Sequence, residues 1–274
     1  MYRDRKIMNL PTKLLCVAMF FFPLFSSPSA LAQTDNGIST AKDAVYGEAG
    51  VDVLYSHTSG VSLFVHSQGV GVNGRWGKFV TAKASRSFAF DLYFTKHLRE
   101  EMTANPVYPE ALPYVFGKSN SMFSLRFLRE HRKELSPKLR FGAVQVGTVA
   151  RYGFSLGFLK PVYLYIGIPE IPYEQIITVE YNPEEHFYDD IYGRAPWVNG
   201  LDELTVVPGI HLGGGLTFEY SSQRGYTKSV EIGTMFDAYL NEMEILASDF
   251  VDPQRLFLSL YIKLEMGSCW TDAR

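Results

Sequence analysis

The chain has 274 residues, a formal net charge of −3 at pH 7, and a composition rich in glycine and aromatic residues, with 23 Gly, 20 Phe and 17 Tyr. The acidic balance argues against a nucleic-acid-binding surface. The two cysteines, Cys16 and Cys269, exclude a disulfide-rich scaffold.

The first 32 residues have the three parts of a secretory signal peptide. Four cations lie within residues 3–13, an apolar run follows over 14–25, and Ala30 and Ala32 form an A-x-A exit. The apolar run is shorter than the roughly 20 residues of a membrane-spanning helix. We therefore expect cleavage after Ala32, with an uncleaved anchor as the alternative, and then a short periplasmic segment over residues 33–48.

Removal of the signal peptide changes both the charge and the cysteine content. Residues 1–32 hold four basic residues and Asp4, a net of +3, so the remaining chain carries about −6. Cys269 is then the only cysteine, which leaves no internal disulfide. No later segment has 18 consecutive apolar residues, so any membrane span must be made of strands.

Apolar and polar residues alternate along the rest of the chain, which predicts two-faced β-strands. In chain order, the expected strands are residues 49–55, 60–76, 86–96, 119–129, 139–166, 204–220, 226–240 and 255–270. The first is included because single-chain bacterial barrels have an even number of strands. In the second, the apolar face switches from odd to even positions, which predicts a bulge near Gln68 and Gly69. The strand over 139–166 either projects beyond the membrane or breaks near Lys160 and Pro161.

The last strand has the clearest pattern. Its even positions from 256 to 266 carry Leu, Leu, Leu, Ile, Leu and Met, whereas its odd positions include Ser259, Lys263 and Glu265. The alternation covers about twice the usual 5–6 residues of a strand in a soluble protein. A strand that crosses a membrane at a tilt needs about 9–11 residues. The length therefore favours a transmembrane strand.

Short and long connections alternate along the chain. The short ones are residues 78–85, 130–138 and 221–225, and the long ones are residues 99–118, 167–203 and 241–254. Outer-membrane barrels have short periplasmic turns and longer external loops. This arrangement also places four aromatic residues at the periplasmic membrane interface, namely Trp76, Tyr220, Tyr226 and Trp270.

The second face of the strands carries small polar residues and charges of both signs. The expected network of charges inside the barrel consists of Arg75, Asp91, Arg126, Arg151, Glu219, Glu231, Lys263 and Glu265. Side chains fill the interior of an eight-stranded barrel, and charges enclosed there must be paired. The balance of signs favours this fold over a soluble β-sandwich with one solvated face. We expect an all-β, antiparallel, transmembrane up-and-down barrel of about eight strands over residues 49–270.

Five sequence blocks in a fixed order carry a family resemblance. They are Phe-Gly-Lys-Ser-Asn-Ser at 116–121, Gly-Phe-Leu-Lys-Pro-Val-Tyr-Leu at 157–164, Ile-Tyr-Gly-Arg-Ala at 191–195, Gly-Leu-Asp-Glu-Leu at 200–204 and Val-Pro-Gly at 207–209. Over residues 60–270 the chain thereby resembles uncharacterised exported proteins of Bacteroidetes that are taken to be outer-membrane β-barrels. The resemblance implies a barrel and an outer-membrane location, and it implies no reaction, ligand or catalytic residue.

Two groups of residues are candidates for a chemical site. The acidic segment 182–190 contains His186 and could bind a divalent cation, but it matches no calcium-loop spacing, and a solvated acidic loop is the expected state. His211 shares a strand face with Glu219 and could serve a lipid-modifying enzyme. A hydrogen-bonded interior histidine is the expected alternative. We therefore expect no catalytic, cofactor-binding or metal-binding residue, and no enzymatic activity.

The function expected from these patterns is a structural or surface-interaction barrel that presents its external loops, chiefly residues 167–203. The expected partners are outer-membrane lipid, lipopolysaccharide, the barrel-assembly machinery during insertion, and an unidentified partner of the loops. Two alternatives stay open: a barrel that transports small solutes, and an outer-membrane enzyme that modifies lipid.

Overall fold

The structure is a computed structural model that describes residues 55–137, 143–168, 174–223 and 225–271. The expected signal peptide, the expected periplasmic segment and all of the expected first strand except Tyr55 lie outside these residues. Within them, no helix is long and apolar enough to span a membrane.

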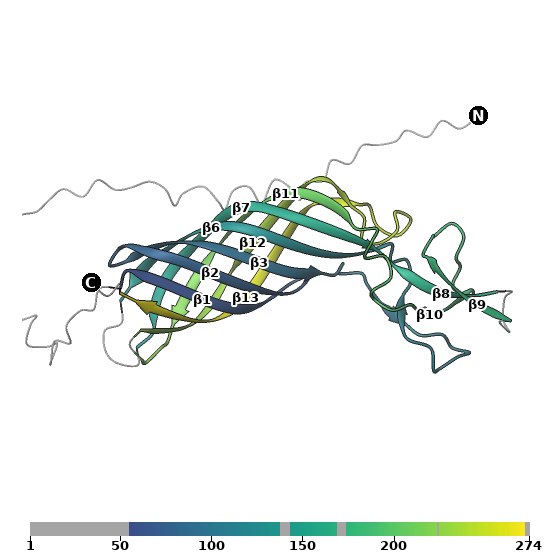
Figure 1. The fold of residues 1–274 in the computed structure, drawn as a ribbon, viewed down its shortest axis with the longest axis horizontal. Helices are drawn as coiled ribbons and strands as arrows, with labels where there is room; N and C mark the ends of the chain where they lie inside the picture. The colour runs from purple at the N-terminus through teal and green to yellow at the C-terminus, as the bar shows by residue number, and fades with distance from the viewer. Residues whose placement is uncertain (1–54, 138–142, 169–173, 224, 272–274) are drawn as a thin grey trace, which may run out of the picture. The chain divides into compact units, whose positions relative to one another are not determined.

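Eight antiparallel strands form a closed barrel (Figure 1). They are β1 (His57–His66), β2 (Gly69–Thr81), β3 (Ala84–Thr95), β6 (Asn120–Ser136), β7 (Gln145–Pro161), β11 (Thr205–Glu219), β12 (Tyr226–Met243) and β13 (Gln254–Trp270). Each strand pairs with the barrel strand before it and the one after it, and β1 pairs with β13 to close the ring. The fold is therefore an all-β up-and-down barrel, as the alternation predicted.

The strand expected over residues 60–76 is in fact two strands joined by a tight turn. β1 ends at His66, β2 begins at Gly69, and these two residues are partners in the register. The prediction of a bulge near Gln68 was wrong, because a two-residue hairpin also moves the apolar face from odd to even positions. The count of eight strands is confirmed, and this hairpin supplies two of them, β1 and β2.

The strand register fixes the stagger of the barrel. The stagger is found by going from each residue to its paired residue on the neighbouring strand, once around the barrel. Starting from His66, this path passes through Tyr261, Gly233, Gly215, Val149, Arg132, Ser85, Phe79 and Ser56. The path ends at Ser56, which is ten positions before His66 in the chain, so the shear number of the barrel is ten. A barrel with such a stagger has strands tilted by about 35–45° and an interior just wide enough for side chains.

The connections follow the expected alternation. The connections between β2 and β3, between β6 and β7 and between β11 and β12 are short, and they lie at the end of the barrel where β1 begins and β13 ends. At the other end, the connections over 96–119, 162–204 and 244–253 are long, and the turn over 67–68 is the exception. We call these the turn end and the loop end. Of the two alternatives for the strand expected over residues 139–166, the structure shows the break near Lys160 and Pro161, because β7 stops at Pro161 and the chain leaves the barrel there.

The long connections contain strands that the sequence did not predict. β8 (Tyr163–Ile168) pairs with β9 (Gln175–Glu180) and with β10 (Ile191–Arg194), and β4 (Met102–Thr103) pairs with β5 (Tyr114–Val115). We call β8, β9 and β10 the loop sheet. Its buried core consists of Tyr114, Leu164, Ile166, Tyr181 and Ile191. Because Tyr114 comes from the β3–β6 connection, two of the long connections share this core.

Glycine at position 71 makes room for large side chains inside the barrel. A Cβ there would overlap the ring of Phe64 and the Cβ of Tyr93, whereas a Cβ at Gly74, on the outer face of β2, would lie 3.5 Å from Trp76. We expect Gly71→Ala to lower the free energy of unfolding by about 1–3 kcal/mol through overpacking. Gly74→Ala is the matched control and should change it by less than about 0.5 kcal/mol. Urea unfolding of both variants in micelles tests this, and equal effects would contradict it.

Candidate functional site

The outer face of the barrel is apolar all the way round. On β13 every second side chain from Leu256 to Met266 points outward, and Leu260 near the middle is 67% exposed. The other strands contribute Leu, Ile, Val and Phe side chains in the same way, among them Leu63, Val72, Phe88, Phe154, Ile210 and Ile232. Monomeric soluble proteins rarely expose a contiguous apolar surface of this extent.

The height of this apolar belt can be derived from the strand geometry. Leu256 and Met266 mark its limits on β13. Ten steps of about 3.3 Å give roughly 33 Å along the strand, which at a tilt of about 40° is roughly 25 Å along the barrel axis. The apolar band of outer-membrane barrels is also about 25 Å tall.

Arg126 on β6 is the centre of the interior charges nearer the loop end. Its Nε and Nη2 donate hydrogen bonds of 3.0 and 2.5 Å to the two carboxylate oxygens of Asp237, and Nη1 lies 3.4 Å from Asp91. Its Cζ lies 3.7 Å from the centroid of the Tyr93 ring. Arg126 is only 1% exposed. Two-pronged contact with a carboxylate is the strongest geometry available to a guanidinium.

Arg151 on β7 holds the interior charges nearer the turn end. Its Nε donates to Glu130 at 2.6 Å, its Nη2 donates to Glu231 at 2.7 Å, and its Nη1 donates to the hydroxyl of Tyr261 at 2.8 Å. The same hydroxyl donates to Glu231 at 2.5 Å. One guanidinium therefore joins side chains from β6, β12 and β13.

Two further arginines extend this cluster around the wall. Arg132 donates to Glu130 at 2.6 Å and to Glu265 at 2.5 Å, and it also lies 3.3 Å from Glu231. Arg75 donates to Glu265 through Nη2 at 2.6 Å. Three carboxylates thus meet three guanidiniums, and the contacts run from β2 on one side to β12 on the other.

The structure places the predicted interior charges as follows. Arg75, Asp91, Arg126, Arg151, Glu231, Lys263 and Glu265 are all buried. Lys263 directs its ammonium toward aromatic rings, 5.4 Å from the centroid of Phe64 and 5.8 Å from that of Tyr261. Glu219 differs, because it lies at the last position of β11 and is only partly buried.

Sequence reasoning omitted three members of this network: Glu130, Arg132 and Asp237. Glu130 and Arg132 fell in an expected turn, although β6 continues to Ser136. Their even numbering, shared with Arg126, was the available signal, because alternate residues of one strand face the same side. With these additions, the interior cations are Arg75, Arg126, Arg132, Arg151 and Lys263, and the interior carboxylates are Asp91, Glu130, Glu231, Asp237 and Glu265. Among the residues that the structure describes, this network therefore holds five cations and five carboxylates, whose charges balance.

His211 belongs to the charge network. Its Nδ1 lies 2.9 Å from Asp237, the carboxylate that also binds Arg126, and its side chain is buried. The nearest strand partners of His211 are Gly153 and Asp237. This geometry fits the hydrogen-bonded interior histidine that was expected, because Asp237 is committed to a guanidinium.

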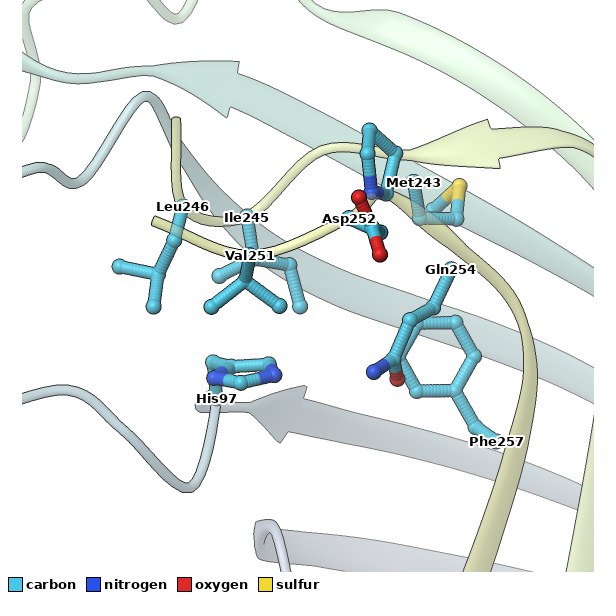
Figure 2. Close-up of a pocket in the computed structure, with 9 residues that line it drawn as sticks. His97, Met243, Ile245, Leu246, Val251, Asp252, Gln254 and Phe257 are labelled. Atoms are coloured by element: carbon cyan, nitrogen blue, oxygen red, sulfur yellow. The ribbon is translucent and has the colours of Figure 1, made fainter. Parts of the chain in front are cut away.

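The loop end of the barrel is closed by apolar side chains. They are Met122, Leu159, Val207, Tyr239, Met243, Ile245 and Phe257. Beside them is a small pocket in which the ring of His97 faces Ile245 and Val251 (Figure 2). Burial lowers the pKa of His97, and this outweighs the opposing effect of Glu100. The lining includes Asp252 and Gln254 but no serine, cysteine or lysine.

The acidic segment 182–190 forms local turns. The side chain of Asn182 accepts a hydrogen bond from the backbone of Glu184 at 3.1 Å, and that of Asp190 accepts one from Phe187 at 3.0 Å. Across the part of the chain that the structure describes, no group of three or more His, Cys, Asp or Glu side chains could hold a metal ion.

The four predicted interface aromatics lie on the surface near the turn end. Tyr220 follows β11, Tyr226 begins β12, and Trp270 ends β13, where its ring stacks on His57 at 5.7 Å between centroids. Trp76 on β2 pairs with Ser59, close to the start of β1. All four side chains are exposed.

No protein-family model and no curated protein matches the sequence. Among solved structures, the chain is similar to Neisserial surface protein A (NspA), with a TM-score of 0.35 and 6% sequence identity over 78% of this chain and 96% of that protein. The closed eight-stranded barrel is established by the strand register itself.

Proposed function

We propose that the protein is an integral outer-membrane barrel with a structural or surface-interaction role. It is exported by the signal peptide over residues 1–32, its apolar belt lies in lipid, and its loop end faces outward. The observation that carries the proposal is that polar and apolar side chains are placed opposite to their usual arrangement in a soluble protein. Balanced charges fill the interior, whereas Leu, Ile, Val and Phe cover the outside.

The interior supports a scaffold rather than a channel. Arg126 and Arg151 reach across the lumen to carboxylates on other strands, and apolar side chains close the loop end. Eight strands enclose just enough space for such side chains and leave no aqueous path. The four surface aromatics at the turn end then serve as anchors at the periplasmic interface, where amphipathic rings are favoured.

Cell fractionation with gel electrophoresis of boiled and unboiled samples tests this proposal. We expect the protein in the outer-membrane fraction, and we expect the unboiled barrel to migrate differently from the boiled chain, because the paired interior keeps it folded in detergent. The same preparation in planar bilayers should give no steady conductance. Recovery of a detergent-free monomer from the periplasm would contradict the membrane location, and a stable open conductance would contradict the filled interior.

A further inference from the structure

A lysine on the outer face of the barrel is covered by one of the long connections. Lys160 is on β7 with the same parity as Phe154 and Phe158, so it points outward. It is nevertheless only 3% exposed. Its ammonium donates hydrogen bonds of 2.8 Å to the backbone carbonyls of Pro161 and Asn199. The turn that contains Asn199 therefore lies against the outer side of the wall.

This turn, residues 195–203, is fixed at both ends to the start of β8. The amide of Ala195 donates to the carbonyl of Tyr163 at 3.1 Å, and the Tyr163 hydroxyl donates to Glu203 at 2.8 Å. The latter bond is the main reason why the pKa of Tyr163 rises to about 12. Between them, Gly200 has a φ of +79°, and a Cβ there would lie 3.0 Å from the Tyr163 ring. These contacts hold residues 195–203 against β8, and we call this turn the platform.

The platform presents apolar side chains beside the belt. Trp197 is 53% exposed and Val198 is 64% exposed, and the Lys160 ammonium lies 5.7 Å from the centroid of a Trp197 ring. Phe158 is on the same face as Lys160, two residues away, which is about 6.6 Å along a strand. Its ring stacks on Phe123 with centroids 4.9 Å apart. Along the outer side of β7, the aromatic side chains of the belt are therefore followed by Lys160, and the Lys160 ammonium lies beside Trp197 of the turn.

We propose that the turn over residues 195–203 is a lipid anchor at the outer membrane interface, which inserts Trp197 and Val198 between the headgroups and the acyl chains. This inference rests on the proposed function, because it requires that the belt lies in lipid. Indole rings favour this boundary because one part of the ring is apolar and the N–H remains hydrated. Lys160 is suited to the same depth, since a lysine stem can lie on apolar surface while its charge is satisfied at the boundary. Residues 195–203 would then anchor the loop end of the barrel in the membrane interface, as the four surface aromatics do at the opposite end.

Tryptophan fluorescence with brominated lipid tests the anchor. The variant W76F/W270F keeps Trp197 as its only tryptophan, and W197F/W270F keeps only Trp76. A third variant adds Phe187→Trp to a chain with all three tryptophans replaced, which places the probe on an exposed position of the acidic segment. Each is reconstituted in vesicles of phosphatidylcholine brominated on the acyl chain near the headgroup.

We expect Trp197 to emit at shorter wavelength and to lose most of its emission to brominated lipid, as Trp76 should, while the probe at position 187 keeps its emission. Quenching of Trp76 without quenching of Trp197 would overturn the anchor and leave the proposed function standing. Quenching of neither would overturn the membrane location itself. A blue-shifted but unquenched Trp197 whose shift grows with the protein-to-lipid ratio would overturn the anchor in favour of a contact between copies.

Discussion

Replacement of Arg151 by leucine is expected to lower the free energy of unfolding by roughly 3–5 kcal/mol, the usual cost of breaking a buried ion pair on one side. The substitution leaves Glu130, Glu231 and Glu265 with two guanidiniums, those of Arg75 and Arg132. It also removes the N–H group that donates a hydrogen bond to the hydroxyl of Tyr261. Urea unfolding in lipid vesicles, followed by the mobility of unboiled samples, measures the loss.

The exposed ion pair at the loop end is the matched control. Arg255 contacts Glu242 at 2.9 Å, and both side chains are more than half exposed. Arg255→Leu should therefore cost no more than about 1 kcal/mol. Adding Glu231→Gln to Arg151→Leu should restore part of the lost stability, because one unpaired negative charge is removed. If Arg151→Leu unfolds at the same urea concentration as the wild-type protein, the interior is hydrated rather than filled.

A lysine at the centre of the apolar belt is expected to destabilise the barrel according to its depth. Leu260 is near the middle of the outward row on β13, and Leu256 is at its loop-end limit. Leu260→Lys should cost about 2–4 kcal/mol in a bilayer, because an ammonium at mid-depth loses its hydration, whereas Leu256→Lys should cost about 0–1 kcal/mol. Unfolding of both variants in the same vesicles provides the comparison.

The difference between the two positions is the informative result. Both are exposed leucines on the same strand and the same face, with 67% and 56% exposure, so their β-propensity and burial are closely matched. A solvated surface would tolerate lysine equally at both. Equal and small effects would therefore show that water, rather than lipid, covers the belt, and they would contradict the proposed location without any bearing on the interior.

The sequence alone determined which side of each strand faces outward. Side chains alternate with a period of two, so the parity of Leu260 or Arg126 is fixed as soon as the strand is recognised. The same parity brought seven of the eight predicted charges into the interior. The sequence also determined the alternation of short and long connections, because the number of residues between two strands distinguishes a tight turn from a long loop.

Only the tertiary structure decided which interior charges meet and where the ring closes. Parity gives a face but no partner, and the contacts of Arg132 with Glu130 and Glu265 depend on the stagger between strands that are far apart in the chain. The switch of face near Gln68 is compatible with a bulge or a hairpin, and the closure of β1 on β13 selects the hairpin. The loop sheet and the turn that covers Lys160 could not be predicted from the sequence either, because they depend on contacts between distant segments of the chain. Strands as short as β10 are stable only when partners from distant segments of the chain complete their hydrogen bonds and bury their apolar side chains.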